Sequence, residues 1–147
     1  MLSGSATSLY RSLGVDWEKA PTRTVAKSLI LHDETDCREL IKRVLLENGH
    51  EVATFAEEEE ALAWTSFNQV NLVIVSLEPG SVQSKICQEF KQLSESLKIL
   101  VLTTYTNRDL ATKALEQGAD DYLLKPIEIK KLEAKVKSII TGKIPTR

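Results

Sequence analysis

The sequence predicts a three-layer α/β fold, in which a parallel sheet of five strands lies between two layers of helices. Two observations support this class. Short apolar segments typical of strands alternate with longer segments of helical spacing between Lys27 and Ile140. The segment from Leu72 to Val75 is apolar at every position, as expected for a strand that helices cover on both faces. The alternation itself favours parallel strands joined by right-handed crossovers.

The composition is that of an ordinary globular domain. The 147 residues suffice for one domain with a sizeable core, and contents of 42% hydrophobic and 27% charged residues are near average. A net charge of -2 shows no basic surplus, so we expect no nucleic-acid partner. No apolar segment approaches membrane-spanning length and no secretory signal begins the chain, so we expect no membrane partner and a cytoplasmic location. Cys37 and Cys87 lie in no metal-ligand pattern.

Residues 1–26 differ from the rest and are expected to form an N-terminal extension. Ser, Thr and Gly dominate its start, and Pro21 interrupts its end. Between them, large apolar side chains recur at the three- and four-residue spacing of a short amphipathic helix, namely Leu9, Tyr10, Leu13 and Trp17. Two interpretations remain open: a flexible arm on the surface, or a short helix that binds a partner or forms a dimer.

The first half of the regular region contains two strands and two helices. Residues 28–31 predict a buried strand, and the helix that follows ends near Asn48. His50 comes next, in a turn, where we expect it to be solvated. Residues 51–55 predict a more polar strand near an edge of the sheet. The four carboxylates at 57–60 open the next helix, where the helix dipole favours negative charge, so we interpret them as a solvated helix start and not a cation site.

The second half continues the alternation. The strand at 72–75 leads to Ser76 and ends before Pro79-Gly80, a strong turn signal. Residues 142–147 are expected to form a short polar tail. The remaining predicted elements are, in chain order, a helix carrying Ile86, Phe90 and Leu93, a strand at 98–102, a helix at 110–115 that stops at Gly118, a strand at 120–124, and a helix at 129–140 that ends near Gly142.

Polar side chains follow four of the predicted strands, at the end where α/β proteins place their sites. They are His32 and Asp33, Ser76, Thr103 and Thr104, and Lys125. Because the carboxyl ends of parallel strands share one edge of the sheet, we expect these groups to converge. A hydrolase triad is not supported, because the Gly-x-Ser-x-Gly turn that exposes such a nucleophile is absent. A hydrolase is therefore not expected.

Residues 27–140 resemble the receiver domain of two-component response regulators. The resemblance rests on Arg38, five residues after Asp33, on a Leu-Val-Ile-Val-x-Leu segment that leads to Pro79, and on a Thr at the end of the fourth strand. Its most specific part is Gly-Ala-Asp-Asp-Tyr-Leu-Leu-Lys-Pro at 118–126. The resemblance implies a flavodoxin-like (βα)5 fold with strand order 2-1-3-4-5 and a receiver-like domain over residues 27–141.

The resemblance also implies roles for particular residues. In that family an Asp at the end of the third strand takes a phosphoryl group from a histidine kinase, and Mg²⁺ held by that Asp and an acidic pair neutralises the charge. Asp33 matches the second acid of the pair. Thr103 and Lys125 match the residues that bind the phosphoryl oxygens, and Tyr122 matches the aromatic switch residue.

Two positions depart from the family pattern. His32 stands at the first acidic position and Ser76 at the phosphoacceptor position. A serine hydroxyl is not an anionic nucleophile, and its phosphoester would lack the acyl character of an aspartyl phosphate. Because Mg²⁺ prefers carboxylate ligands, Asp33 alone is a weak candidate for it, with Glu34 or Glu78 as substitutes. We therefore expect no metal and no other cofactor.

Lys125 still needs a partner, because an unpaired ammonium in a partly buried position is costly. We predict a contact between Lys125 and Asp33 in place of the metal-filled pocket.

The resemblance further implies a partner face on the last two helices and the last strand, which carries Lys113, Asp121, Lys131 and Lys135. Asp121 and Lys135 are of opposite charge and suit pairing across a two-fold axis. Lys131 would oppose Lys113 and weaken such a dimer. A weak homodimer is the expectation.

We conclude from the sequence that the chain is a receiver-like signalling module, or pseudo-receiver, that acts through protein–protein interaction without aspartyl phosphorylation. We therefore expect that it is not an enzyme. Its expected partner is a protein, with a histidine kinase or an output protein as candidates. The short tail predicts no output domain, hence a single-domain adaptor or an excised regulatory domain. The alternative is a phosphotransfer-competent receiver with non-standard acceptor chemistry. A small-molecule-binding domain of the same fold is less favoured, because no phosphate-binding loop follows the first strand.

Overall fold

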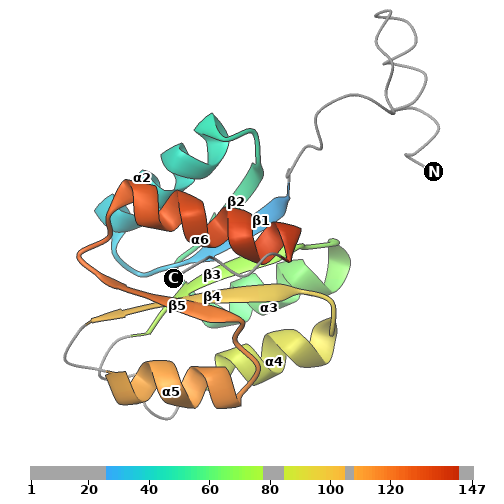
Figure 1. The fold of residues 1–147 in the computed structure, drawn as a ribbon. Helices are drawn as coiled ribbons and strands as arrows, with labels where there is room; N and C mark the ends of the chain where they lie inside the picture. The colour runs from blue at the N-terminus through green and yellow to red at the C-terminus, as the bar shows by residue number, and fades with distance from the viewer. Residues whose placement is uncertain (1–25, 78–84, 105–107, 143–147) are drawn as a thin grey trace, which may run out of the picture.

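In the computed structural model, residues 26–77, 85–104 and 108–142 are described, and strands and helices alternate along them (Figure 1). The strands are β1 (Lys27–Leu31), β2 (Glu51–Phe55), β3 (Leu72–Ser76), β4 (Lys98–Thr104) and β5 (Asp121–Lys125). The helices are α2 (Thr35–Glu47), α3 (Glu58–Phe67), α4 (Ile86–Leu93), α5 (Arg108–Glu116) and α6 (Ile129–Thr141). The predicted alternation is confirmed.

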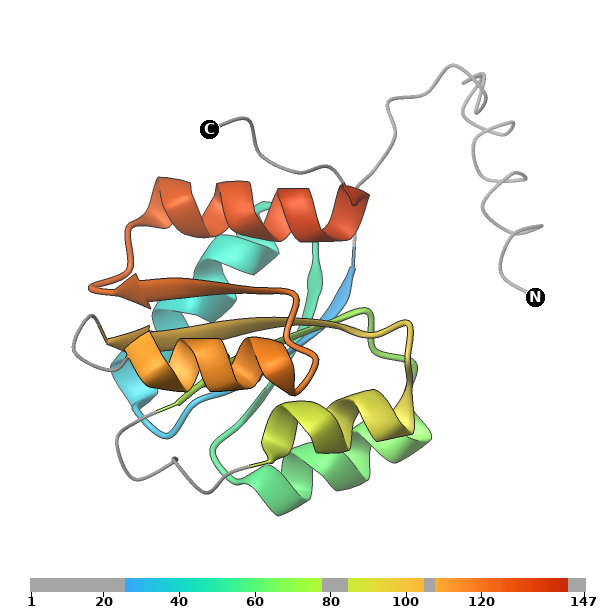
Figure 2. The same ribbon diagram turned by 60° about the horizontal axis from the view of Figure 1, so that its bottom comes forward.

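The sheet is parallel throughout, with the order β2-β1-β3-β4-β5. This is the predicted flavodoxin-like order, and the more polar strand β2 lies at an edge as expected. Helices α2 and α6 cover one face of the sheet, and α3, α4 and α5 cover the other (Figures 1 and 2). The predicted three-layer architecture is therefore confirmed.

The apolar core consists of two clusters, one on each face of the sheet. Leu72 and Ile74 of β3 belong to the cluster beneath α2 and α6, whereas Val73 and Val75 belong to the cluster beneath α3, α4 and α5. Successive side chains of a strand point to opposite faces, so a central strand must be apolar at every position. The unbroken apolar sequence of β3 follows from this burial.

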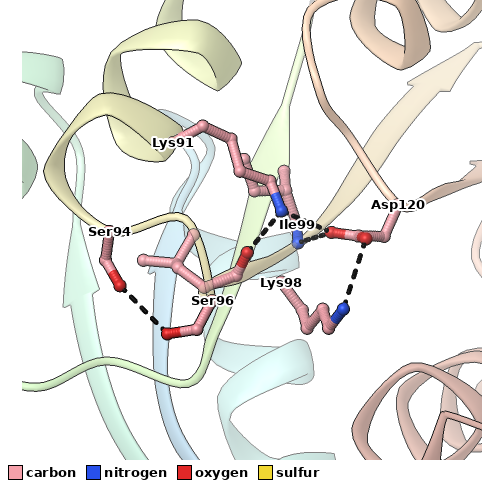
Figure 3. A network of polar contacts seen from close by, with 7 residues as sticks. Lys91, Ser94, Ser96, Lys98, Ile99 and Asp120 are labelled. Atoms are coloured by element: carbon pink, nitrogen blue, oxygen red, sulfur yellow. Dashed lines mark hydrogen bonds and ion pairs between the residues drawn. The ribbon is translucent and has the colours of Figure 1, made fainter.

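A polar network closes the end of the sheet where β4 and β5 begin (Figure 3). The Asp120 carboxylate accepts a hydrogen bond from Ile99 N at 2.8 Å and contacts the Lys91 and Lys98 ammonium groups at 3.2 and 3.8 Å. Gly118 just before it has a φ of 115°, and an added Cβ would lie 3.0 Å from Lys91 Cγ. The Gly-Ala-Asp sequence thus ties α4 to the entry of β5.

His50 differs from its expectation. Its side chain is buried, and its Nδ1 accepts a hydrogen bond from Ala26 N at 2.9 Å. Burial lowers the pKa of His50 from its ordinary value. His50 is buried because the Ala26 N–H lies just before β1, outside the hydrogen-bond ladder of the sheet, and the ring nitrogen of His50 supplies its acceptor.

Several expectations fall outside the described residues. The N-terminal extension over 1–25, the turn at Glu78-Pro79-Gly80 and tail residues 143–147 are among them. Within the described part of the chain, no helix has the length and apolar character needed to cross a membrane.

Candidate functional site

Four polar side chains come from the carboxyl ends of four strands. Ser76 is the last residue of β3, and it pairs in register with Leu102, so Thr103 of β4 lies one residue further along. In the same sheet Thr104 pairs with Lys125, the last residue of β5. His32 directly follows β1, and its N–H continues the ladder by donating to Phe55 O at 3.0 Å. The predicted convergence of strand ends is therefore present.

Ser76 and Lys125 are joined directly. The Lys125 ammonium donates to Ser76 Oγ at 2.8 Å, although strand β4 lies between β3 and β5. The long lysine side chain spans this distance along the sheet edge. Sequence reasoning missed this bond, because it sought an acidic partner for the lysine. The predicted strand order could have indicated this bond, because it places β5 only two strands from β3.

Thr103 is buried without a hydrogen-bond partner for its hydroxyl. Its exposed fraction is 0%, and among the described residues no group bonds to its Oγ1. A buried hydroxyl in this state costs free energy, so it requires an explanation. An oxygen ligand that enters the site, such as an anion, would satisfy it.

His32 is a structural acceptor. The ring is buried, and its Nδ1 accepts a hydrogen bond from Glu34 N at 3.1 Å. A nitrogen that accepts carries no proton, so the 3.4 Å approach of Asp33 Oδ1 to this nitrogen is not a salt bridge. The Arg38 guanidinium donates to His32 O at 2.7 Å. The loop after β1 is thereby fixed by His32 and Arg38 together.

The predicted contact between Lys125 and Asp33 is wrong. Lys125 instead donates to Ser76, and the Asp33 carboxylate is 76% exposed beside His32. An exposed carboxylate keeps its hydration, so pairing it with an ammonium at the sheet edge would gain little free energy.

The described residues do not fit a Mg²⁺ ion. Among them, no group of three or more His, Cys, Asp or Glu side chains could hold a metal. Asp33 supplies one exposed carboxylate, the Nδ1 of the His32 imidazole accepts from a backbone N–H, and Ser76 Oγ accepts from an ammonium. Magnesium needs hard oxygen ligands that include carboxylates, and these three groups offer only one carboxylate.

The predicted partner face is only partly available for pairing with another chain. The Lys135 ammonium binds Asp121 Oδ2 at 2.9 Å within the same chain, and Lys131 binds Glu128 at 3.1 Å. Asp121 and Lys135, which the sequence suggested as partners across a dimer axis, thus satisfy each other. Lys113 on α5 is exposed.

Tyr122 lies partly buried, with its ring packed against the core cluster beneath α3, α4 and α5. The Lys135 ammonium lies 6.0 Å from the ring centroid. A groove of about 990 Å³ runs along β5 and α6, and Tyr122, Lys125, Lys131 and Lys135 are among its lining residues. The site and the partner face therefore meet at β5.

Comparison with known proteins shows which family the chain resembles. The response regulator receiver domain model matches residues 29–137. A relative from Cyanophora paradoxa, "Probable transcriptional regulator ycf27", is 34% identical over 115 residues, which are 78% of this chain and 48% of the relative. "Two-component response regulator PhoP" of Pseudomonas aeruginosa is 32% identical over 115 residues, 78% of this chain and 51% of the relative. The chain thus spans about half the length of the curated relatives it matches.

A solved structure has the same fold. The response regulator receiver domain protein from Clostridium thermocellum matches with a TM-score of 0.72 and 28% sequence identity, over 80% of this chain and 96% of that chain.

Proposed function

Since this chain belongs to the response regulator receiver domain family, we propose that it is a receiver-like signalling module that binds a protein partner without aspartyl phosphorylation. The observation that carries the proposal is the serine at the end of β3, whose hydroxyl accepts a hydrogen bond from Lys125. We infer that this serine occupies the place of the phosphoacceptor aspartate. The module over residues 27–141 is then a pseudo-receiver.

The chemistry of Ser76 supports this proposal. A hydroxyl attacks phosphorus only when a base removes its proton, and here its oxygen faces a donating ammonium. The Nδ1 atom of His32 is not available as that base, because it already accepts from the Glu34 N–H. With Asp33 as the sole acid of the matched pocket positions, the charge of an incoming phosphoryl group would also lack a metal to neutralise it.

A second candidate function is a receiver that still takes a phosphoryl group, with non-standard acceptor chemistry. One observation favours it: the buried Thr103 hydroxyl lacks a partner among the described residues, near the end of the sheet where Lys125 supplies positive charge. Such groups suit the oxygens of an anion. This candidate is weaker, because it leaves the nucleophile unexplained.

The proposed partner is a protein, either a histidine kinase or an output protein, and it would contact the face that carries Lys113, Asp121, Lys131 and Lys135. Some relatives are named as transcriptional regulators, and the matched segment is about half of their length. We propose that the receiver-like domain itself binds no nucleic acid, in keeping with its net charge of -2. We propose no enzymatic role for the domain.

An amide NMR titration tests this function. The protein receives Mg²⁺ and then Mg²⁺ with beryllofluoride, a mimic of the phosphoryl group. We expect no saturable shift at Asp33, Ser76, Thr103 or Lys125. Saturable shifts that spread to Tyr122 would support the second candidate and contradict the first.

The matched control is a variant with carboxylates at the two positions that depart from the family pattern. In the double variant His32→Asp and Ser76→Asp the pocket regains carboxylates at both departing positions, so it should bind Mg²⁺ and the mimic. A response in this variant with none in the natural chain would show that the two departures account for the loss. If neither chain responds, the positions assigned here to the pocket are wrong.

A further inference from the structure

The end of the domain opposite the strand-end site carries exposed apolar side chains. Phe67 is the last residue of α3 and is 89% exposed. Trp64 lies one helical turn before it and is partly buried, and Leu93, 45% exposed, ends the neighbouring helix α4. Helices α3 and α4 lie side by side (Figures 1 and 2). We call Trp64, Phe67 and Leu93 the α3 end surface.

The chain enters the fold beside this surface. Lys27, the first residue of β1, donates through its backbone N to Asn71 Oδ1 at 2.9 Å and through its ammonium to Asn68 Oδ1 at 3.4 Å. The same ammonium lies 5.4 Å from the centroid of the Trp64 ring. Asn68 is the neighbour of Phe67 in sequence. The point at which residues 1–25 join the domain therefore lies at the rim of the α3 end surface.

The preceding sequence has the side chains to cover such a surface. Its large apolar residues have helical spacing and are otherwise set among polar ones: Leu9, Tyr10, Leu13 and Trp17. Residues 18–25 separate the last of these from Ala26. Eight residues reach up to about 26–29 Å when extended, which is ample for a return to the end of α3.

We propose that residues 1–25 of this chain dock on the α3 end surface, with the apolar positions of the segment against Phe67. Phe67 then acts as the anchor, and Trp64 and Leu93 flank it. The short connection gives the segment an effective concentration in the millimolar range at this surface, so weak apolar contacts suffice. A second copy of the chain would have to make the same contacts without this high effective concentration.

The test uses the full chain and the indole N–H signal of Trp17 in amide NMR spectra. Phe67→Ser removes the anchor, and because Phe67 is exposed the variant should fold normally. We expect the docking constant to fall about tenfold, since one large apolar side chain no longer becomes buried. The Trp17 indole signal should then move toward its position in an unfolded chain.

The matched control is Leu46→Ser. Leu46 is 50% exposed near the end of α2, on the other side of the sheet, so its replacement should leave the Trp17 signal in place. A reciprocal variant, Trp17→Ser, should shift the amide signals of Phe67 and Asn68.

Three results would overturn the proposal. The first is a Trp17 signal that does not change in Phe67→Ser, and the second is a signal that changes equally in Leu46→Ser. Either result would mean that the segment does not bind to this surface. Shifts that grow with protein concentration would identify a second copy as the occupant. The test involves neither Mg²⁺ nor a phosphoryl mimic, so its outcome is independent of the proposed function.

Discussion

At the scale of single residues, the site is defined by what each polar atom already binds. Ser76 Oγ accepts from Lys125, and His32 Nδ1 accepts from Glu34 N, so neither atom is set up as a base or nucleophile. Thr103 Oγ1 has no partner among the described residues. Two residue-scale predictions follow from buried polar atoms of this kind.

Thr103→Val should raise the free energy of unfolding by about 1–2 kcal/mol, because a methyl group replaces a buried hydroxyl that makes no hydrogen bond. Urea denaturation measures the change. Thr103→Ser is the control, since it keeps the hydroxyl and should not stabilise the protein. A loss of stability in Thr103→Val would mean that the hydroxyl has a partner in solution.

His50 should make the protein less stable in mild acid. Burial lowers the pKa of His50, so below about pH 6.5 the unfolded chain binds a proton that the folded chain does not. The free energy of unfolding therefore decreases as the pH is lowered. Thermal unfolding between about pH 7.5 and pH 5.5 measures this slope. In His50→Asn, an amide oxygen can still accept from Ala26 N, but the side chain cannot titrate, so the slope should decrease. An unchanged slope would assign the titration to another group.

At the scale of elements, short sequence motifs are explained by the contacts between neighbouring helices and strands. The Gly-Ala-Asp sequence before β5 brings Asp120 to Ile99 N and to the Lys91 ammonium (Figure 3). This contact joins α4, β4 and the entry of β5. It is also far from the strand-end site, so its role is structural.

Asp120→Ala should lower the free energy of unfolding by about 2 kcal/mol, because the Ile99 N–H loses its acceptor and Lys91 loses its ion pair. Asp120→Asn can keep an oxygen for Ile99 and loses only the charge, so it should cost less. Chemical denaturation of both variants separates the two contributions. Equal losses would show that the ion pair stabilises the fold more than the backbone hydrogen bond does.

At the scale of the whole molecule, the two apolar clusters share the central strands and should unfold together. Phe90 of α4 is fully buried in the cluster beneath α3, α4 and α5. Phe90→Ala should lower the free energy of unfolding by about 3–5 kcal/mol. Amide hydrogen exchange should accelerate equally in slow amides of both faces, for example at Leu29 and Ile30, whose side chains point to opposite clusters. Acceleration confined to one face would mean that the layers unfold separately.

The fold class, the order of the elements and the group of polar residues at the strand ends could all be predicted from the sequence. These features follow from local periodicity and from the rule that parallel strands end at one edge of a sheet. The sequence also predicted the polar edge strand at 51–55 and the ends of the helices near Asn48 and Gly118, because each of these features depends on residues a few positions apart.

The pairing of the polar atoms could not be predicted from the sequence and depends on the folded chain. Lys125 binds Ser76 and not Asp33, His50 is buried on Ala26 and not solvated, and Asp121 pairs with Lys135 inside one chain. Each contact joins segments at least 14 residues apart. Local propensity carries no information about such partners, because they are selected by strand order, side-chain length and the requirement that buried donors and acceptors be satisfied.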